Sequence, residues 1–368
     1  MQKLNKYLLL INLFFLQSYL IRFNLGPYPS NLQEVLIALN GLTFLATLIK
    51  EKRWPNWRKH WILGIFLILS AVSFLSNTII SEIDFIRHLK FLFFAGTLTT
   101  IFLETFNQEK EKIAAFEVMG LGAIIFGIFS VTYNLLGFNV AHDLRLLGPL
   151  DAAVYLAYYF APFFIFFTLR RNWLYALILG LLILSTKSMG AIGGSAVVIG
   201  FYYARKIDKR ILISVATLLA VVIFYNKILP TIQTDYSSLD ERGEIWQVSG
   251  HLLSDWQTLI FGAGLSQFEA SYIEAADTVL GRPPLDYHVI QPHNIFLLFI
   301  FHYGILGLIF ILYLIYEVLC RPKSVFSWML IYFFIHGLID TPYYKNDLLF
   351  ILMLLMSLAV FPRGKRLA

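Results

Sequence analysis

Apolar residues along the chain gather into long runs that short polar hinges separate. A run of about 20 apolar residues is long enough to cross the hydrocarbon core of a bilayer as a helix. The runs lack the period-two alternation of barrel strands, so helices are the expected spanning structure. The pattern therefore predicts about 12 transmembrane helices, at residues 7–20, 31–49, 61–77, 86–103, 113–136, 151–169, 173–186, 190–204, 211–229, 294–317, 325–339 and 347–361.

The pair 173–186 and 190–204 is short and rich in glycine, so whether it crosses the membrane completely stays open. The basic start of the chain and the run 7–20 resemble a signal peptide. No small-residue cleavage site follows, and we expect an uncleaved first span.

One long segment, residues 230–293, interrupts the pattern of spans. Between Trp246 and Trp256 it carries an amphipathic stretch, which is typical of a helix that lies along a membrane surface. We therefore expect an all-α integral membrane protein. Residues 1–368 form a single polytopic membrane domain, and 230–293 is its one long extracytoplasmic loop, with amphipathic helices.

The composition agrees with a membrane protein. Hydrophobic residues make up 58% of the 368 residues and charged residues only 14%, whereas soluble domains carry about 25% charged residues. The mean hydropathy is +0.69. The lone cysteine, Cys320, excludes an intrachain disulfide and a cysteine metal cluster.

Lysine and arginine set the expected orientation, because cytoplasmic loops hold an excess of them. If the N-terminus is cytoplasmic, 20 of the 29 basic residues fall in cytoplasmic segments. Both termini are therefore expected in the cytoplasm and the long loop on the outer side. The net charge of +6 reflects this topology, and no nucleic-acid partner is expected.

Three of the remaining basic residues are candidate anion ligands on the outer side. Arg145 lies in the hinge before the span 151–169, Lys187 lies in the turn after 173–186, and Arg242 lies in the long loop. Each also has a purely structural interpretation: a surface ion pair for the two arginines, and an interfacial anchor for the lysine.

His293 is the first candidate for acid–base chemistry. It follows Pro292 and precedes Asn294 and an apolar run, which favours a helix start at this point. The positive end of the helix dipole favours a neutral imidazole that can accept a proton, and it attracts phosphate oxygens. The alternatives are a helix cap or an interfacial histidine. His302 is expected to be a packed core residue, and His336 to pair with Asp340 across one helical turn.

Motifs for metals and cofactors do not occur in the sequence. The stretch Gly262-Ala263-Gly264 is not followed by the Lys-Ser/Thr of a phosphate-binding loop. No serine nucleophile elbow, zinc-binding His-Glu-x-x-His or aspartate-rich cluster appears. We expect no cofactor and no metal.

Taken in order, several short motifs resemble the O-antigen ligase and Wzy-type polymerase superfamily of bacterial membrane glycosyltransferases. They comprise Arg145 to Gly148, Ser185 to Gly190, Arg242 to Phe268, Pro-His-Asn-x-Phe-Leu from Pro292, and the tail from His336 to Asp347. The resemblance covers about residues 140–350.

This resemblance implies an inverting, metal-independent glycosyltransferase of the bacterial inner membrane that acts in cell-envelope polysaccharide or lipopolysaccharide biosynthesis. Its donor would be a glycan on undecaprenyl diphosphate, and its acceptor a hydroxyl of a glycan, lipid or protein. His293 would be the general base, and Arg145, Arg242 and Lys187 would bind the donor diphosphate. Asn294 and Trp246 would contact the acceptor or support these residues. Many relatives have arginine at the position of Lys187, which is a point charge without the fork of a guanidinium.

Other functions stay open at this stage. Ligase and Wzy-type polymerase share the donor chemistry, and the sequence does not give the sugar, the linkage or the oligomeric state. A transporter or flippase for lipid-linked sugars would use discontinuous helices and ionisable groups near the bilayer midplane. A structural or receptor-like membrane protein is the third alternative.

Overall fold

The computed structural model describes residues 1–25, 28–76, 82–139, 144–150, 152–204, 238–264, 267–320, 324–341 and 346–360. Eleven of the twelve predicted segments coincide with helices, and 211–229 lies outside the described residues. These helices are α1 (Gln2–Phe14), α2 (Leu32–Glu51), α3 (Trp61–Ser76), α4 (Glu82–Thr105), α5 (Glu109–Leu135), α6 (Ala153–Leu169), α7 (Trp173–Thr186), α8 (Met189–Ala204), α14 (Ile295–Cys320), α15 (Val325–His336) and α16 (Asn346–Val360).

Within the described residues, α2, α5 and α14 are long and apolar enough to cross a membrane. The helices α3, α6, α7, α8, α15 and α16 are apolar but shorter. The apolar helices identify a membrane protein of the all-α class. The number of crossings and the side on which each loop lies remain predictions.

A small β-hairpin was not foreseen from the sequence. Strands β1 (Arg22–Leu25) and β2 (Tyr28–Asn31) pair antiparallel, with Arg22 opposite Asn31. The hairpin follows the 3₁₀ helix η1 (Leu16–Leu20) and leads into α2, whose first turn is capped by the side chain of Asn31.

Helix α6 lies inside the bundle. Nearly all of its residues are buried, and it packs against α7, α8 and α15. Most of its side chains are aromatic or aliphatic, so it buries apolar surface on every side, as expected for a helix that is hydrophobic all round. This helix supports the loop that follows α15.

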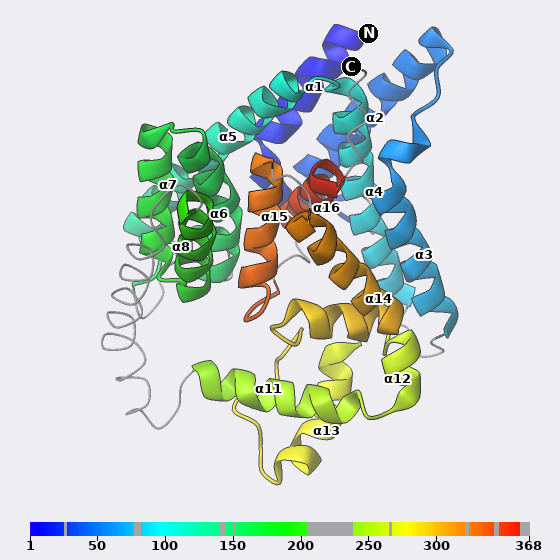
Figure 1. Ribbon diagram of the computed structural model, residues 1–368, viewed down its shortest axis with the longest axis vertical. Helices are drawn as coiled ribbons and strands as arrows, with labels where there is room; N and C mark the ends of the chain where they lie inside the picture. Colours follow the sequence, from blue (N-terminus) through cyan, green and yellow to red (C-terminus); the bar gives the residue numbers. More distant parts are fainter. Residues whose placement is uncertain are drawn as a thin grey trace.

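The described residues of the predicted long loop, from 238 onwards, include the helices α11 (Ser238–Leu252), α12 (Trp256–Phe261) and α13 (Phe268–Leu280). They lie at one end of the bundle, and the N-terminus lies at the other end (Figure 1). Ile245 and Val248 of α11 pack against α13 and against Phe301 of α14 in a second apolar core. The loop helices are therefore packed onto the bundle through α14.

Helix α14 is broken at Gly304, whose φ of 64° and ψ of −157° are not helical. Only glycine adopts this backbone region readily. The break leaves the carbonyl of Phe301 without its helical partner, and the amides of Ala263 and Gly264 bond to it at 2.8 and 3.3 Å. The chain just after α12 thus fills the break, and the first half of α14 runs at an angle to the second (Figure 1).

Candidate active site

His293 lies immediately before α14, close to where the Pro292-His293-Asn294 pattern predicts a helix start. Asn294 is the N-cap, because its side-chain oxygen accepts hydrogen bonds from the amides of Phe296 and Leu297 at 2.9 and 3.2 Å. His293 itself has a φ of 47°. A histidine in this left-handed region costs energy that the surroundings must offset.

Three contacts to other elements hold the backbone on both sides of His293. Trp246 of α11 donates its indole N–H to the carbonyl of Pro292 at 3.1 Å. The amide of Ile295 bonds to the carbonyl of Gly337 at 2.7 Å. The side chain of Asn294 donates to the carbonyl of Leu338 at 3.0 Å. The imidazole is therefore presented by α11 and by the segment after α15 together.

Asp340 is the side-chain partner of His293. Its Oδ1 lies 3.1 Å from Nδ1 of His293 and accepts the amide of Thr341 at 2.8 Å. The aspartate is buried, while the imidazole is 30% exposed. Burial raises the pKa of Asp340, but the hydrogen bond and charge of His293 and further contacts outweigh it, so the pKa lies below its ordinary 3.8.

Arg242 lies on the other oxygen of the same carboxylate. Its Nη2 is 3.7 Å from Oδ2 of Asp340, and its Nε donates to the carbonyl of Ile339 at 2.8 Å. The ion pair is therefore made with a residue that is distant in sequence. An imidazole and a guanidinium thus share one buried carboxylate.

The loop that carries Asp340 rests on buried aromatic rings. Tyr158 of α6 donates its hydroxyl to the carbonyl of Asp340 at 3.1 Å, and its ring stacks on His336 with centroids 3.6 Å apart. Nδ1 of His336 lies 2.7 Å from the hydroxyl of Tyr332. The expected pairing of His336 with Asp340 is therefore replaced by these two contacts.

Gly190 of α8 approaches His336 so closely that a β-carbon there would overlap Nε2 of the imidazole. It would also lie 2.9 Å from Cδ1 of Ile339. The turn after α7 therefore lies against the segment that supplies Asp340, and only glycine permits this approach.

Arg145 and Lys187 lie in two turns that are joined to each other. The amide of Leu146 donates to the carbonyl of Ser185 at 2.9 Å. Asn134 holds the first turn, because its side chain bonds to the carbonyl of Arg145 and the amide of Gly148. Both cationic side chains are exposed.

The predicted site residues thus separate into two groups. His293, Asn294, Trp246 and Arg242 are joined by the contacts above. Arg145 and Lys187 are connected to them through the α7–α8 turn and Gly190. Contact of Arg145 and Lys187 with a diphosphate stays a prediction.

The sequence predicted a pairing of Asp340 with His336, whereas the side-chain partner in the structure is His293. The polar stretch from His336 to Asp347 in an otherwise apolar region indicated a functional segment. It did not indicate His293 as the partner of Asp340, because a contact between residues 47 positions apart depends on tertiary packing. His302 is buried, as predicted for a core residue. Within the described ranges, no three His, Cys, Asp or Glu side chains form a group that could hold a metal ion.

No curated protein matches the chain. Residues 152–312 match a family model described as O-antigen ligase. The matched segment begins just before α6, contains α7, α8 and the loop helices, and ends within α14, so it includes His293, Arg242 and Lys187. Residues 152–312 therefore resemble an O-antigen ligase domain, and this match supports a place in the O-antigen ligase and Wzy-type superfamily.

Proposed function

We propose that this protein transfers a glycan from an undecaprenyl-diphosphate-linked donor to an acceptor hydroxyl, with inversion and without a metal ion. The observation that carries the proposal is the shared carboxylate of Asp340, with His293 on one oxygen and Arg242 on the other. The match of residues 152–312 to the O-antigen ligase family model supports the class of reaction.

In this proposal Asp340 selects the nitrogen of His293 that does the chemistry. An ionised carboxylate only accepts hydrogen bonds, so Nδ1 of His293 carries the hydrogen in their 3.1 Å contact. Nε2 then has the lone pair that accepts the proton of the acceptor hydroxyl. A general base in hydrogen-bond reach contributes about 10² to 10⁴ in rate.

The bond changes balance without a further reactant. The acceptor oxygen forms a bond to the anomeric carbon from the side opposite the leaving group, and its proton moves to Nε2 of His293. The bond between the anomeric carbon and the diphosphate oxygen breaks, and both electrons leave with the undecaprenyl diphosphate. Attack from the opposite side inverts the anomeric configuration.

The arginines are proposed to stabilise the charge that develops on the leaving diphosphate. A guanidinium has five N–H donors in a planar fork, which suits phosphate oxygens. Arg242 is positioned beside His293 through Asp340. Arg145 and Lys187 are proposed as further diphosphate ligands, and Trp246 and Asn294 as residues that hold the backbone of His293 and border the acceptor.

A transfer assay tests the proposal. The purified protein is incubated with a lipid-linked glycan and an acceptor, and His293→Ala is compared with His288→Ala, an exposed histidine of the same loop. We expect loss of transfer by at least 10² for His293→Ala and little change for the control. Transfer by His293→Ala within a few-fold of the parent would remove the general base.

A polymerase of the Wzy type uses the same donor chemistry and is the closest alternative. The acceptor distinguishes the two: a growing lipid-linked glycan indicates a polymerase, and a lipid core or a protein hydroxyl indicates a ligase. Deletion of the gene separates them as well. Single lipid-linked repeat units would accumulate without a polymerase, and free lipid-linked polymer without a ligase.

The break in α14 is an observation that also suits a transporter, because transporters use discontinuous helices. Here the chain after α12 fills the break, and its backbone amides bond to the carbonyl of Phe301. That carbonyl is therefore bonded to the protein itself. Reconstitution in liposomes decides between the two functions, since a flippase moves the lipid-linked glycan across the bilayer without forming a new glycosidic bond.

A further inference from the structure

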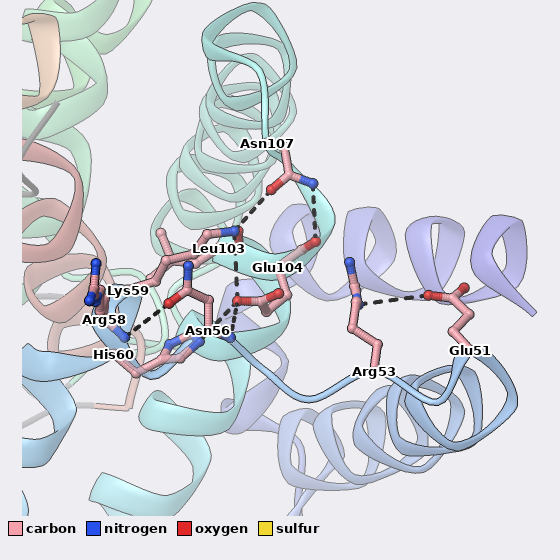
Figure 2. Close-up of polar contacts among 9 residues, drawn as sticks. All are labelled: Glu51, Arg53, Asn56, Arg58, Lys59, His60, Leu103, Glu104 and Asn107. Carbon is pink, nitrogen blue, oxygen red and sulfur yellow. Dashed lines mark hydrogen bonds and ion pairs between the residues drawn. The ribbon is translucent and has the colours of Figure 1, made fainter. Parts of the chain in front are cut away.

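A buried carboxylate on the bundle side holds the connection between α2 and α3, residues 52–60. Glu104 lies near the end of α4, and its Oε1 accepts the backbone amide of Asn56 at 3.1 Å (Figure 2). The same oxygen lies 3.2 Å from Nε2 of His60. The middle of this short connection and its α3 end are therefore held at one point on the bundle.

Lys59 also points inward and is satisfied there. Its ammonium lies 2.9 Å from Oδ1 of Asn107 and 3.3 Å from the carbonyl of Leu103, and it is 3.7 Å from Glu104 (Figure 2). Because these polar groups hold the inner side of the connection, its outer side is presented in a defined conformation.

Two tryptophans project from the outer side. Trp54 is 89% exposed and Trp57 is 74% exposed. The guanidinium of Arg58 lies 5.7 Å from the ring centre of Trp57. Within the described residues, Arg58 and Lys52 make no ion pair with a carboxylate, whereas Arg53 lies 3.7 Å from Glu51. We call residues 52–58 the tryptophan loop.

The location of the tryptophan loop indicates what covers it. The loop directly follows α2, which is long and apolar enough to cross a membrane and ends at Glu51. It therefore lies at a membrane boundary, whichever face that is, and Figure 1 places it at the end of the bundle away from α11 and α13. Along α2 an exposed apolar stripe leads up to it, formed by Leu39, Leu42, Leu45 and Ile49.

We propose that the tryptophan loop binds the headgroup of an anionic phospholipid whose acyl chains lie along the apolar stripe of α2. Tryptophan prefers the headgroup level of a bilayer, where its ring is in an apolar layer and its N–H reaches polar groups. Arg58 and Lys52 supply the positive charge that complements the lipid phosphodiester. The stripe selects a lipid over a soluble anion, and the charge selects an anionic lipid over a neutral one.

Thermal unfolding of the purified full-length chain tests the proposal without any activity assay. The protein in neutral detergent is titrated with phosphatidylglycerol, with phosphatidylcholine or with inorganic phosphate. We expect phosphatidylglycerol to raise the midpoint of unfolding and the other two additives to have little effect, because a bound ligand stabilises the folded state. Equal shifts with phosphatidylcholine or with inorganic phosphate would overturn the proposal.

Variants locate the effect. The double variant Lys52→Asn/Arg58→Gln should bind phosphatidylglycerol more weakly by a factor of about 10 or more, since each cation near an anionic surface is worth roughly a factor of five. Asparagine is chosen because Lys52 has a left-handed φ of 50°. The matched control is Lys3→Gln/Lys110→Gln, two lysines at the starts of α1 and α5.

Native mass spectrometry gives a second readout if the double variant is less stable. The fraction of protein that retains phosphatidylglycerol should fall in Lys52→Asn/Arg58→Gln and in Trp54→Leu/Trp57→Leu, and should stay at the parent level in the lysine control. Retention at the parent level in both loop variants would contradict the proposal. The lipid-binding measurement does not depend on His293 or Arg242. The proposal of lipid binding can therefore be contradicted without affecting the proposal of glycan transfer, and the reverse also holds.

Discussion

Nδ1 of His293 lies 3.1 Å from Oδ1 of Asp340, although 47 residues separate the two in the chain. The contact joins the start of α14 to the loop after α15. It orients the ring and sets which nitrogen carries the hydrogen. The second oxygen of Asp340 faces Arg242, so the position of the aspartate affects both residues proposed to act on the substrate.

Replacement of Asp340 by asparagine tests this orientation. The side-chain amide of the asparagine can donate to Nδ1 of His293 and so favour the tautomer with hydrogen on Nε2. In that tautomer Nε2 has no lone pair to accept a proton. We expect kcat for glycan transfer to fall by about 10² to 10⁴, the contribution of general base catalysis. Asp277→Asn, at an exposed aspartate of α13 that bonds to Tyr287, is the control. A kcat within a few-fold of the parent for Asp340→Asn would contradict the role.

Arg242→Lys keeps the positive charge and removes the planar fork. If Arg242 stabilises the leaving diphosphate through two parallel hydrogen bonds, the barrier should rise by about 1 to 3 kcal/mol, mainly in kcat. Arg282→Lys is a comparison from the same loop, because Arg282 pairs with Glu244 away from His293. Unchanged kcat and KM in Arg242→Lys would assign Arg242 to a surface ion pair with Asp340.

Gly304→Ala tests the break in α14. A β-carbon would overlap the carbonyl of Ile260, and the backbone at Gly304 is in a region that other residues avoid. We expect a loss of stability of roughly 2 kcal/mol or more together with lower transfer, because His293 lies just before the first half of α14. Gly193→Ala in α8 is the control: its β-carbon meets open space, and alanine favours a helix by about 0.5 to 1 kcal/mol.

The pKa of Asp340 gives a pH dependence of stability. Because its folded pKa lies below the ordinary 3.8, the ionised form stabilises the fold. That contribution is fully present above pH 3.8 and disappears as the pH falls through the folded pKa. The difference in unfolding midpoint between the parent and Asp340→Asn should therefore stay constant at higher pH and narrow below pH 3.8. A difference that grows as the pH falls would contradict the assignment.

The apolar helices among the described residues could be predicted from the sequence, because long apolar runs favour helices in a membrane. The predicted start at 294 and the observed start of α14 at Ile295 differ by one residue, since Pro292 and Asn294 are local signals. The break at Gly304 could not be predicted, because one glycine in an apolar run is compatible with a continuous helix. The pairing of β1 with β2 was missed because the strands are only four residues long.

The candidate site could be predicted only in part. His293 and Arg242 stand out individually, as polar residues at a helix start and in an outer loop. Asp340, the partner that they share, does not stand out in the sequence. A pairing with His336, four residues earlier, was equally reasonable from the sequence. Tertiary packing sets the pairing: the hydroxyl of Tyr332 meets Nδ1 of His336 and the ring of Tyr158 stacks on the imidazole. The carboxylate of Asp340 faces His293.

The break in α14 also fixes the chain after α12 against the first half of that helix. Lifting α12 away would leave the Phe301 carbonyl without the amides of Ala263 and Gly264, at a cost of roughly 1 to 3 kcal/mol for an unsatisfied buried group. The chain after α12 and the first half of α14, which begins two residues after His293, are therefore expected to move as one rigid body.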